Sequence, residues 1–163
     1  MSGNGKPGES SPRDYAIGPL AAGDLEAVIA IDRRLSGTVR RGFFERRLAA
    51  ALREPDRFVY VGARSAGVLA GFALARLTEG EFGRQARLAA LDAFGVEAAH
   101  QHHGVGHMLL DEIDAILAHK GIEQLTTQID WADQDLVRFL AMCGFAVSPR
   151  LVLARDTHTP DRL

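Results

Sequence analysis

The sequence predicts an α+β fold, with one mixed, mostly antiparallel β-sheet flanked by helices. Three observations indicate this class. Apolar strand-like runs alternate with amphipathic segments, two of the runs are joined by a tight turn, and the composition is that of a globular domain. The 163 residues are 47% hydrophobic, which is enough to bury one core.

The expected domain spans residues 14–155 and lies between two tails. Residues 1–13 are rich in Gly, Ser and Pro and show no apolar periodicity, so we expect a disordered N-terminal tail. Residues 156–163 are expected to form a C-terminal tail. The sequence between them contains no internal repeat and no linker.

The first half of the domain is expected to form a strand, two helices and a hairpin. A strand over residues 15–20 precedes a helix over residues 24–35, whose apolar residues share one broad face. Thr38 is expected to cap a second helix, which passes through Phe44 and ends near Pro55. Residues 58–64 and 68–77 are expected to pair as antiparallel strands across a turn at residues 65–67.

The second half is expected to alternate strands and helices. A strand over residues 86–96 leads through a polar loop and two glycines into a long helix. A strand over residues 126–131, a short helix over residues 133–142 and a final strand over residues 150–155 complete the predicted order.

The loop before the long helix has the layout of an anion site. Gly104 and Gly106 let the backbone approach a ligand, and the N–H groups of a first helical turn have no intrahelical partner. The helix dipole contributes only roughly 0.3–1 kcal/mol, so converging N–H groups must supply most of the binding. The segment therefore predicts a bound phosphate.

The spacing argues against two familiar phosphate motifs. A nucleoside-triphosphate loop has Lys and then Ser or Thr after its last glycine, whereas His107 and Met108 follow Gly106. A dinucleotide motif has a third glycine, but Leu109 occupies that region and a long helix follows. The pattern that remains is Gln101-x-x-Gly104-x-Gly106.

This pattern resembles the Gln/Arg-x-x-Gly-x-Gly/Ala signature with which the GNAT acyltransferase superfamily holds the pyrophosphate of acetyl-coenzyme A. The resemblance extends over residues 15–155, because the order of the predicted elements and the Gly144-Phe145 pair also match that family. It implies the GNAT acyl-CoA N-acyltransferase fold. In that fold the pantetheine arm enters between the fourth and fifth strands.

By this resemblance, acetyl-CoA is the expected co-substrate. The expected cofactor-binding residues are Phe94, Gly95, Val96, Gln101, His102, His103, Gly104, Val105, Gly106, His107, Asp133 and Phe139. Asp133 stands where the family usually has Asn, and Leu140 stands where a tyrosine acid is frequent. No metal is expected, because neighbouring histidines cannot easily converge on a tetrahedral ion.

The implied reaction is transfer of an acetyl group to a primary amine in a ternary complex, which requires a proton acceptor. Asp92 interrupts an otherwise apolar strand and is the candidate catalytic base. A surface or salt-bridged role for Asp92 is the open alternative. Glu79, Glu81 and Asp130 are the other candidate carboxylates, and no general acid is found because Leu140 cannot donate a proton.

Two other functions stay open: a non-catalytic acyl-CoA-binding or sensing module, and an N-acyltransferase that uses a longer acyl-CoA. The expected partner is a small-molecule or peptide amine, and a homodimer is left open. The net charge of −2 and the lack of a long apolar run argue against nucleic-acid and membrane partners. The single cysteine, Cys143, fits a reducing compartment, and we expect a cytoplasmic protein.

The first two predicted helices are markedly basic. An acidic acceptor could be steered toward them. The alternative is an ordinary solvated surface, because acidic residues are interleaved with the basic ones. The arginines concerned are Arg33, Arg34, Arg40, Arg41, Arg46, Arg47, Arg53 and Arg57.

Overall fold

The computed structural model describes residues 14–79 and 87–157. Two compact units are present, residues 1–128 and residues 129–163, and each is described by itself. The predicted tail over residues 1–13, most of the second predicted tail and the candidate carboxylate of Glu81 lie outside the described residues.

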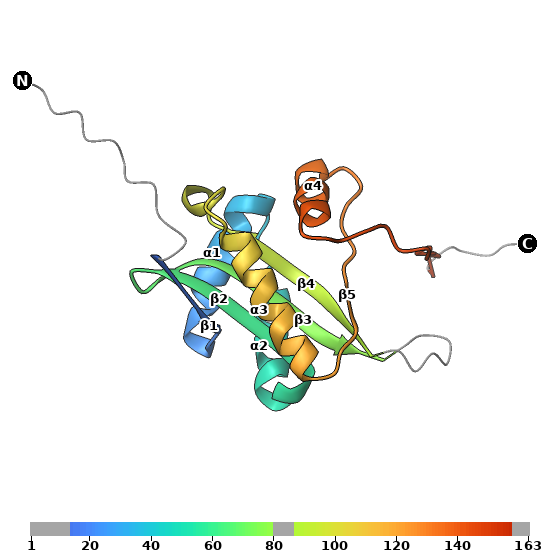
Figure 1. The fold of residues 1–163 in the computed structure, drawn as a ribbon, viewed down its shortest axis with the longest axis horizontal. Helices are drawn as coiled ribbons and strands as arrows, with labels where there is room; N and C mark the ends of the chain where they lie inside the picture. Colours follow the sequence, from blue (N-terminus) through green and yellow to red (C-terminus); the bar gives the residue numbers. More distant parts are fainter. Residues whose placement is uncertain (1–13, 80–86, 158–163) are drawn as a thin grey trace, which may run out of the picture. The chain divides into compact units, whose positions relative to one another are not determined.

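The first unit is built on a five-stranded sheet whose strands lie side by side in chain order (Figure 1). β1 pairs with β2, β2 with β3 and β3 with β4 in antiparallel ladders, whereas β4 and β5 are parallel. The predicted mixed, mostly antiparallel sheet is thereby confirmed. The strands are β1 (Tyr15–Pro19), β2 (Phe58–Ser65), β3 (Val68–Thr78), β4 (Leu88–Val96) and β5 (Gln124–Thr126).

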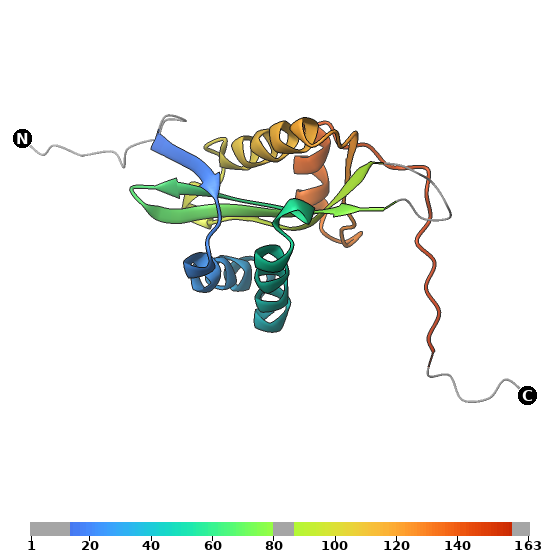
Figure 2. The same ribbon diagram turned by 90° about the horizontal axis from the view of Figure 1, so that it is seen from below.

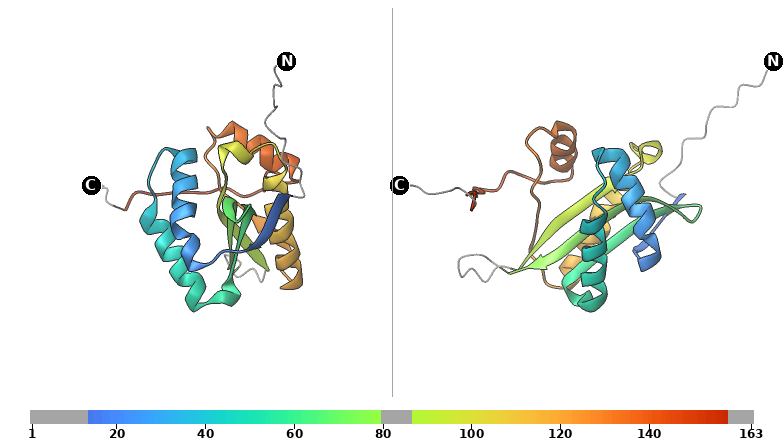
Figure 3. Two further views of the ribbon diagram at one scale, coloured as in Figure 1. Left: turned by 90° about the vertical axis from the view of Figure 1, so that its left-hand side faces the viewer. Right: turned by 180° about the vertical axis from the view of Figure 1, so that it is seen from behind.

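Helices cover both faces of this sheet. α1 (Leu25–Ser36) and α2 (Arg41–Arg53) lie on one face, and α3 (Val105–His119) lies on the other (Figures 2 and 3). Leu109, Ile113 and Leu117 recur every four residues along α3 and are buried, as the helical period requires of a face that packs on a sheet. The sheet is therefore the middle layer of this unit.

The main core lies between the sheet and the pair α1 and α2. Val28 and Phe44 from the helices and Phe72 from β3 are fully buried there. The rings of Phe44 and Phe72 meet edge to face, with centroids 5.8 Å apart. This packing holds α2 against the sheet and fixes which of its faces points away from the core.

Two local predictions in the first unit are wrong. Thr38 does not cap α2, which begins after Arg40; instead its hydroxyl lies 3.2 Å from that of Ser36. In place of the strand predicted over residues 126–131, β5 spans Gln124–Thr126, so only Thr126 lies in both. Thr127 leaves the ladder and donates its side-chain hydroxyl to the carbonyl of Leu91 at 3.0 Å, so a side chain replaces the backbone pairing.

The second unit contains α4 (Gln134–Met142), close to the predicted helix. Asp133 caps it by accepting the N–H of Leu136 at 3.1 Å. The strand predicted over residues 150–155 is wrong, because the structure assigns no ladder to that segment. Leu151 and Leu153 are 88% and 89% exposed, so the apolar residues there follow a strand pattern without the burial that stabilises a strand.

Candidate functional site

The site begins at a change of partner along β4. Its ladder with β5 covers Leu88–Ala90, while its ladder with β3 continues to Val96. The β4–β5 pairing therefore ends six residues before β4 does, so Phe94 lies beyond it. Along the β3 ladder, Leu74 pairs with Ala93 but Ala75 pairs with Leu91, so Asp92 is the extra residue of a β-bulge.

The loop that follows β4 is tied to the sheet at several points. The side-chain amide of Gln101 donates to the carbonyl of Val96, the last residue of β4, at 3.0 Å. The hydroxyl of Tyr15 on β1 lies 2.9 Å from Nδ1 of His100. Glu97 forms an ion pair with Arg34 of α1. These contacts fix the loop at the point where it leads into α3.

The backbone of this loop forms a concave turn at the start of α3. His102 and Gly104 both have positive φ, 63° and 80°, on either side of His103. A positive φ is unusual for a residue other than glycine, and alternating backbone handedness of this kind turns successive N–H groups toward one point. Gly104 is the N-cap of α3, so the N–H groups of Val105 and Gly106, in the first turn that follows it, have no partner within the helix.

The turn has the space and the donors that an anion needs. A Cβ atom at Gly104 would meet no atom within 4 Å, so the backbone is open at this position. Nδ1 of His103 is buried and has no hydrogen-bond partner within the described part of the chain. A buried polar atom without a partner is costly, and a ligand oxygen would satisfy it. These features fit a phosphate group.

The candidate base, Asp92, lies between two arginines. Nε of Arg76 on β3 donates to both of its oxygens at 3.1 and 3.0 Å, and Nε of Arg47 on α2 lies 3.2 Å from Oδ2. The Asp92 side chain is 10% exposed. Asp92 is therefore salt-bridged, as the alternative left open from the sequence has it, and the apolar surroundings predicted for it are wrong, because α2 and β3 bring two guanidinium groups to this position.

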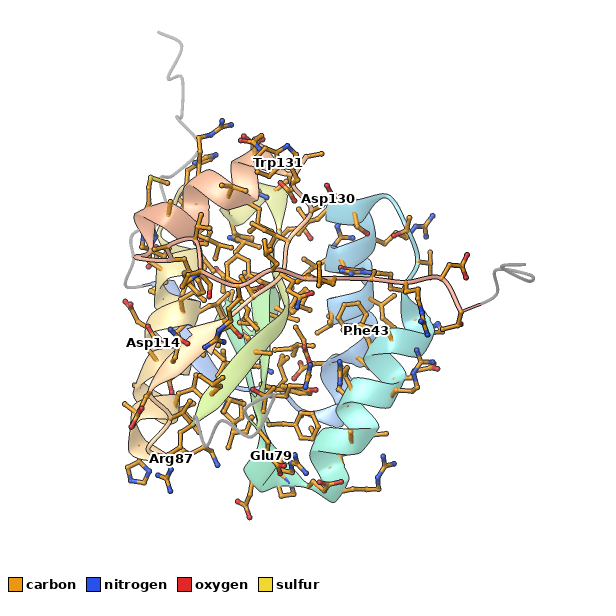
Figure 4. The ribbon with its side chains drawn as sticks, turned by 90° about the vertical axis from the view of Figure 1, so that its right-hand side faces the viewer. Phe43, Glu79, Arg87, Asp114, Asp130 and Trp131 are labelled. Atoms are coloured by element: carbon orange, nitrogen blue, oxygen red, sulfur yellow. The ribbon has the colours of Figure 1, made fainter. Side chains whose placement is uncertain are left out.

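A hollow of about 460 Å³ continues from Arg47 along α2. Phe43 stands at one end of it, on the side of α2 that turns toward the strands (Figure 4), and its ring lies 5.3 Å from the Arg47 guanidinium carbon. Tyr60 of β2 lies nearby and donates its hydroxyl to the carbonyl of Arg47 at 3.1 Å. Burial raises the pKa of Tyr60 to about 12, so this phenol is neutral and acts as a donor.

The other candidates lie elsewhere. Glu79 follows β3 and is 93% exposed, with its carboxylate 3.8 Å from Arg57. Asp130, Asp133 and Phe139 belong to the second unit, where Asp130 accepts the N–H of Ala132 at 2.8 Å. The structure thus brings together the predicted residues of β4 and of the turn before α3. Their roles, and those of the three residues of the second unit, stay predictions.

Sequence reasoning missed Arg76 and the pairing of Arg47 with Asp92. Arg76 lies one strand away from Asp92, and the bulge changes the register by one residue, so its proximity was not visible in the spacing. The positive φ of His102 was also missed. The one sequence feature that pointed toward cationic groups near the site was the run of arginines on the second predicted helix.

The family model described as the acetyltransferase (GNAT) family matches residues 25–145. A search of the curated proteins found no match. Among solved structures, the chain is similar to the aminoglycoside N-acetyltransferase AAC(6')-Iy in complex with a bisubstrate analogue of coenzyme A. The two share 17% identity with a TM-score of 0.74, and the match covers 87% of this chain and 97% of that one.

Two further structures have a similar fold. An aminoglycoside acetyltransferase from an uncultured soil metagenomic sample, solved with trehalose, has 17% identity and a TM-score of 0.71 over 91% of this chain and 99% of that one. A glucosamine-6-phosphate N-acetyltransferase from Arabidopsis thaliana has 14% identity and a TM-score of 0.69 over 88% of this chain and 98% of that one. Within the described ranges, no helix is long and apolar enough to cross a membrane.

Proposed function

Because the chain belongs to the acetyltransferase (GNAT) family and is an N-acetyltransferase of that type, we propose that it moves an acetyl group from acetyl-CoA to a primary amine by direct transfer in a ternary complex. The observation that carries the proposal is the open, left-handed turn at Gly104, which begins α3 and follows the stretch of β4 that no longer pairs with β5. The candidate anion site therefore comes shortly after the end of β4.

The turn at residues 102–107 binds the pyrophosphate of the cofactor in this proposal. The first N–H groups of α3 donate to phosphate oxygens, and the dipole of α3 favours the negative charge. Nδ1 of His103 is the side-chain atom available to join them. Gln101 keeps the turn in place through its bond to the Val96 carbonyl.

The end of β4 binds the arm that carries the thioester. Gly95 and Val96 lie beyond the last β4–β5 pair, and in this proposal they hydrogen-bond the extended arm in the manner of an added strand, with Phe94 as a further contact. Backbone N–H groups there are donors for the carbonyl oxygen as negative charge develops on it. Asp133 and Phe139 of the second unit are proposed as further contacts.

Asp92 is the proposed proton acceptor for the amine, directly or through water. It projects from the bulge two residues before Phe94 and is nearly buried. The amine nitrogen forms a bond to the carbonyl carbon, the carbon–sulfur bond breaks, and the amine proton passes to the carboxylate. With Leu140 at the place of the frequent tyrosine, we propose that solvent protonates the leaving thiolate.

The experiment is a broad amine panel with detection of the released thiol. The proposal predicts thiol release above the rate of acetyl-CoA hydrolysis for at least one class of amine. Acetyl-CoA binding without amine-dependent release would instead identify a non-catalytic binding module. Faster release from a longer acyl-CoA than from acetyl-CoA would identify a different acyl donor.

A further inference from the structure

We infer that the amine acceptor carries a second, anionic group, a carboxylate or a phosphate, which is held by the arginines that line the hollow along α2. This inference rests on the proposed function, because it assigns the acceptor of that same reaction. It concerns residues of the first unit only.

The hollow lies beside the face of α2 that enters the core, and Phe43 borders both. Phe44 and Leu48 point into the core, whereas Phe43, Arg46, Arg47, Ala50 and Arg53 line the hollow together with Ala49. Phe43, Arg47 and Ala50, and likewise Arg46, Ala50 and Arg53, are spaced three or four residues apart, so these side chains lie along one stripe of the helix. The two alanines leave room between the arginines. The stripe is therefore a shallow recess with cationic side chains along it.

The positive charge of this hollow is not neutralised by the helix itself. Within residues 14–79 and 87–157, Arg46 and Arg53 have no ion pair. The two carboxylates of α2 and its C-cap are directed to other arginines, since Glu45 pairs with Arg41 and Glu54 with Arg57. The acidic residues that interleave with these arginines in the sequence therefore do not cancel them in space.

Arg47 joins the hollow to the proposed site of transfer. It shares the carboxylate of Asp92 with Arg76, so one negative charge stands against two positive charges at that end. Nε of Arg47 is buried and makes no hydrogen bond in the described part of the chain. Guanidinium groups arranged in this way bind carboxylate and phosphate oxygens through paired N–H donors. An anionic group in the hollow would place the rest of a small amine beside Asp92.

The same charges oppose a polycationic acceptor. Two of the structural relatives are described as aminoglycoside acetyltransferases, whose substrates carry several amino groups. A site with unpaired arginines repels such a molecule, and repulsion of the wrong ligand is as effective for specificity as attraction of the right one. The acceptor of this chain is thus expected to differ in charge from an aminoglycoside.

The test uses pairs of amines that differ only in the anionic group. Suitable pairs are glycylglycine with glycylglycinamide, and phosphoethanolamine with ethanolamine, which separate a carboxylate from a phosphate. For at least one pair we expect kcat/KM to be at least about tenfold higher for the anionic member, as a charge-assisted hydrogen bond predicts. An aminoglycoside is expected to be a poorer substrate than that anionic amine.

Two variants identify the residues responsible. Arg46→Gln and Arg53→Gln each remove one charge from the hollow without touching the ion pairs of Asp92. We expect each to raise KM for the anionic amine several-fold, with little change in kcat and none in acetyl-CoA affinity. Arg33→Gln is the matched control, because Arg33 is an exposed arginine of α1 outside the hollow. It should leave KM for the anionic amine and kcat unchanged.

The outcomes separate this inference from the proposed function. Equal kcat/KM for both members of every pair, or a preference for the neutral members, overturns the inference and leaves the proposed function standing. Equal effects of the two variants on anionic and neutral amines also overturn it. Acetyl-CoA binding without transfer to any amine overturns both.

Discussion

Gly104→Ala tests the cofactor turn most cleanly, because the chain contains a matched control. Gly104 has a φ of 80° and Gly37, which ends α1, has a φ of 72°; a Cβ atom at either position would meet no atom within 4 Å. Alanine therefore imposes the same backbone strain at both sites and no clash with the protein at either. Only at Gly104 would the added methyl group stand in the proposed anion site.

The expected magnitudes follow from the strain and from the lost contacts. A left-handed alanine costs about 1–2 kcal/mol, so both variants should unfold at temperatures roughly 2–8 °C lower than the wild type. Loss of one hydrogen bond to a charged phosphate oxygen costs about 1.5–3 kcal/mol, which weakens acetyl-CoA binding by about 10- to 150-fold in Gly104→Ala. Gly37→Ala should bind acetyl-CoA as the wild type does.

The assay is thermal unfolding with and without acetyl-CoA, with calorimetry for the dissociation constant. Ligand at 100 times the wild-type dissociation constant stabilises the fold by about 2.7 kcal/mol, or roughly 5–11 °C for a protein of this size. Gly37→Ala should keep this shift, and Gly104→Ala should lose about half to nine-tenths of it. Equal shifts in the two variants would refute the assignment of the phosphate site to this turn.

Three further predictions concern single side chains. Asp92→Asn should lower kcat by at least roughly tenfold at neutral pH and leave acetyl-CoA affinity unchanged. At high pH kcat should partly recover, because the amine then loses its proton unaided. A kcat equal to that of the wild type would show that Asp92 is structural. Leu140→Tyr should lower the melting temperature, because Leu140 is 3% exposed and extra volume in a packed position costs about 1–3 kcal/mol. Turnover per folded molecule should stay nearly unchanged. A loss of turnover in folded enzyme that still binds acetyl-CoA would contradict protonation of the thiolate by solvent. Burial raises the pKa of Tyr60 to about 12, so the folded protein keeps this phenol neutral at pH values where the unfolded chain ionises it. The free energy of unfolding should therefore fall between about pH 10 and 12. In urea unfolding, Tyr60→Phe should lack this alkaline decrease in stability, and the same decrease in wild type and variant would contradict the prediction.

The elements predicted correctly from the sequence are those whose signals lie within their own residues. The turn between β2 and β3, for example, contains Ala66 and Gly67 at positive φ, and the glycine marked it in the sequence. The long helix α3 was predicted from glycines at its start and an apolar period that the sheet then buries. Both signals lie within a few residues of the structure they specify.

The failures involve partners that are distant in the sequence. The continuous apolar run at residues 151–154 has the composition of a strand, yet a strand also requires a neighbour to pair with, which no local pattern reveals. The surroundings of Asp92 were misjudged for the same reason. Arg47 reaches it from another layer and Arg76 from across a bulge, and neither proximity follows from the spacing along β4.

Direct transfer between the two substrates is tested most directly by initial velocities measured while both acetyl-CoA and the preferred amine are varied. A ternary complex predicts double-reciprocal lines that intersect, with one thiol released for each amine acetylated. Parallel lines would show an acetylated enzyme intermediate. Parallel lines, or thiol release that does not depend on the amine, would contradict direct transfer of the acetyl group from bound acetyl-CoA to bound amine.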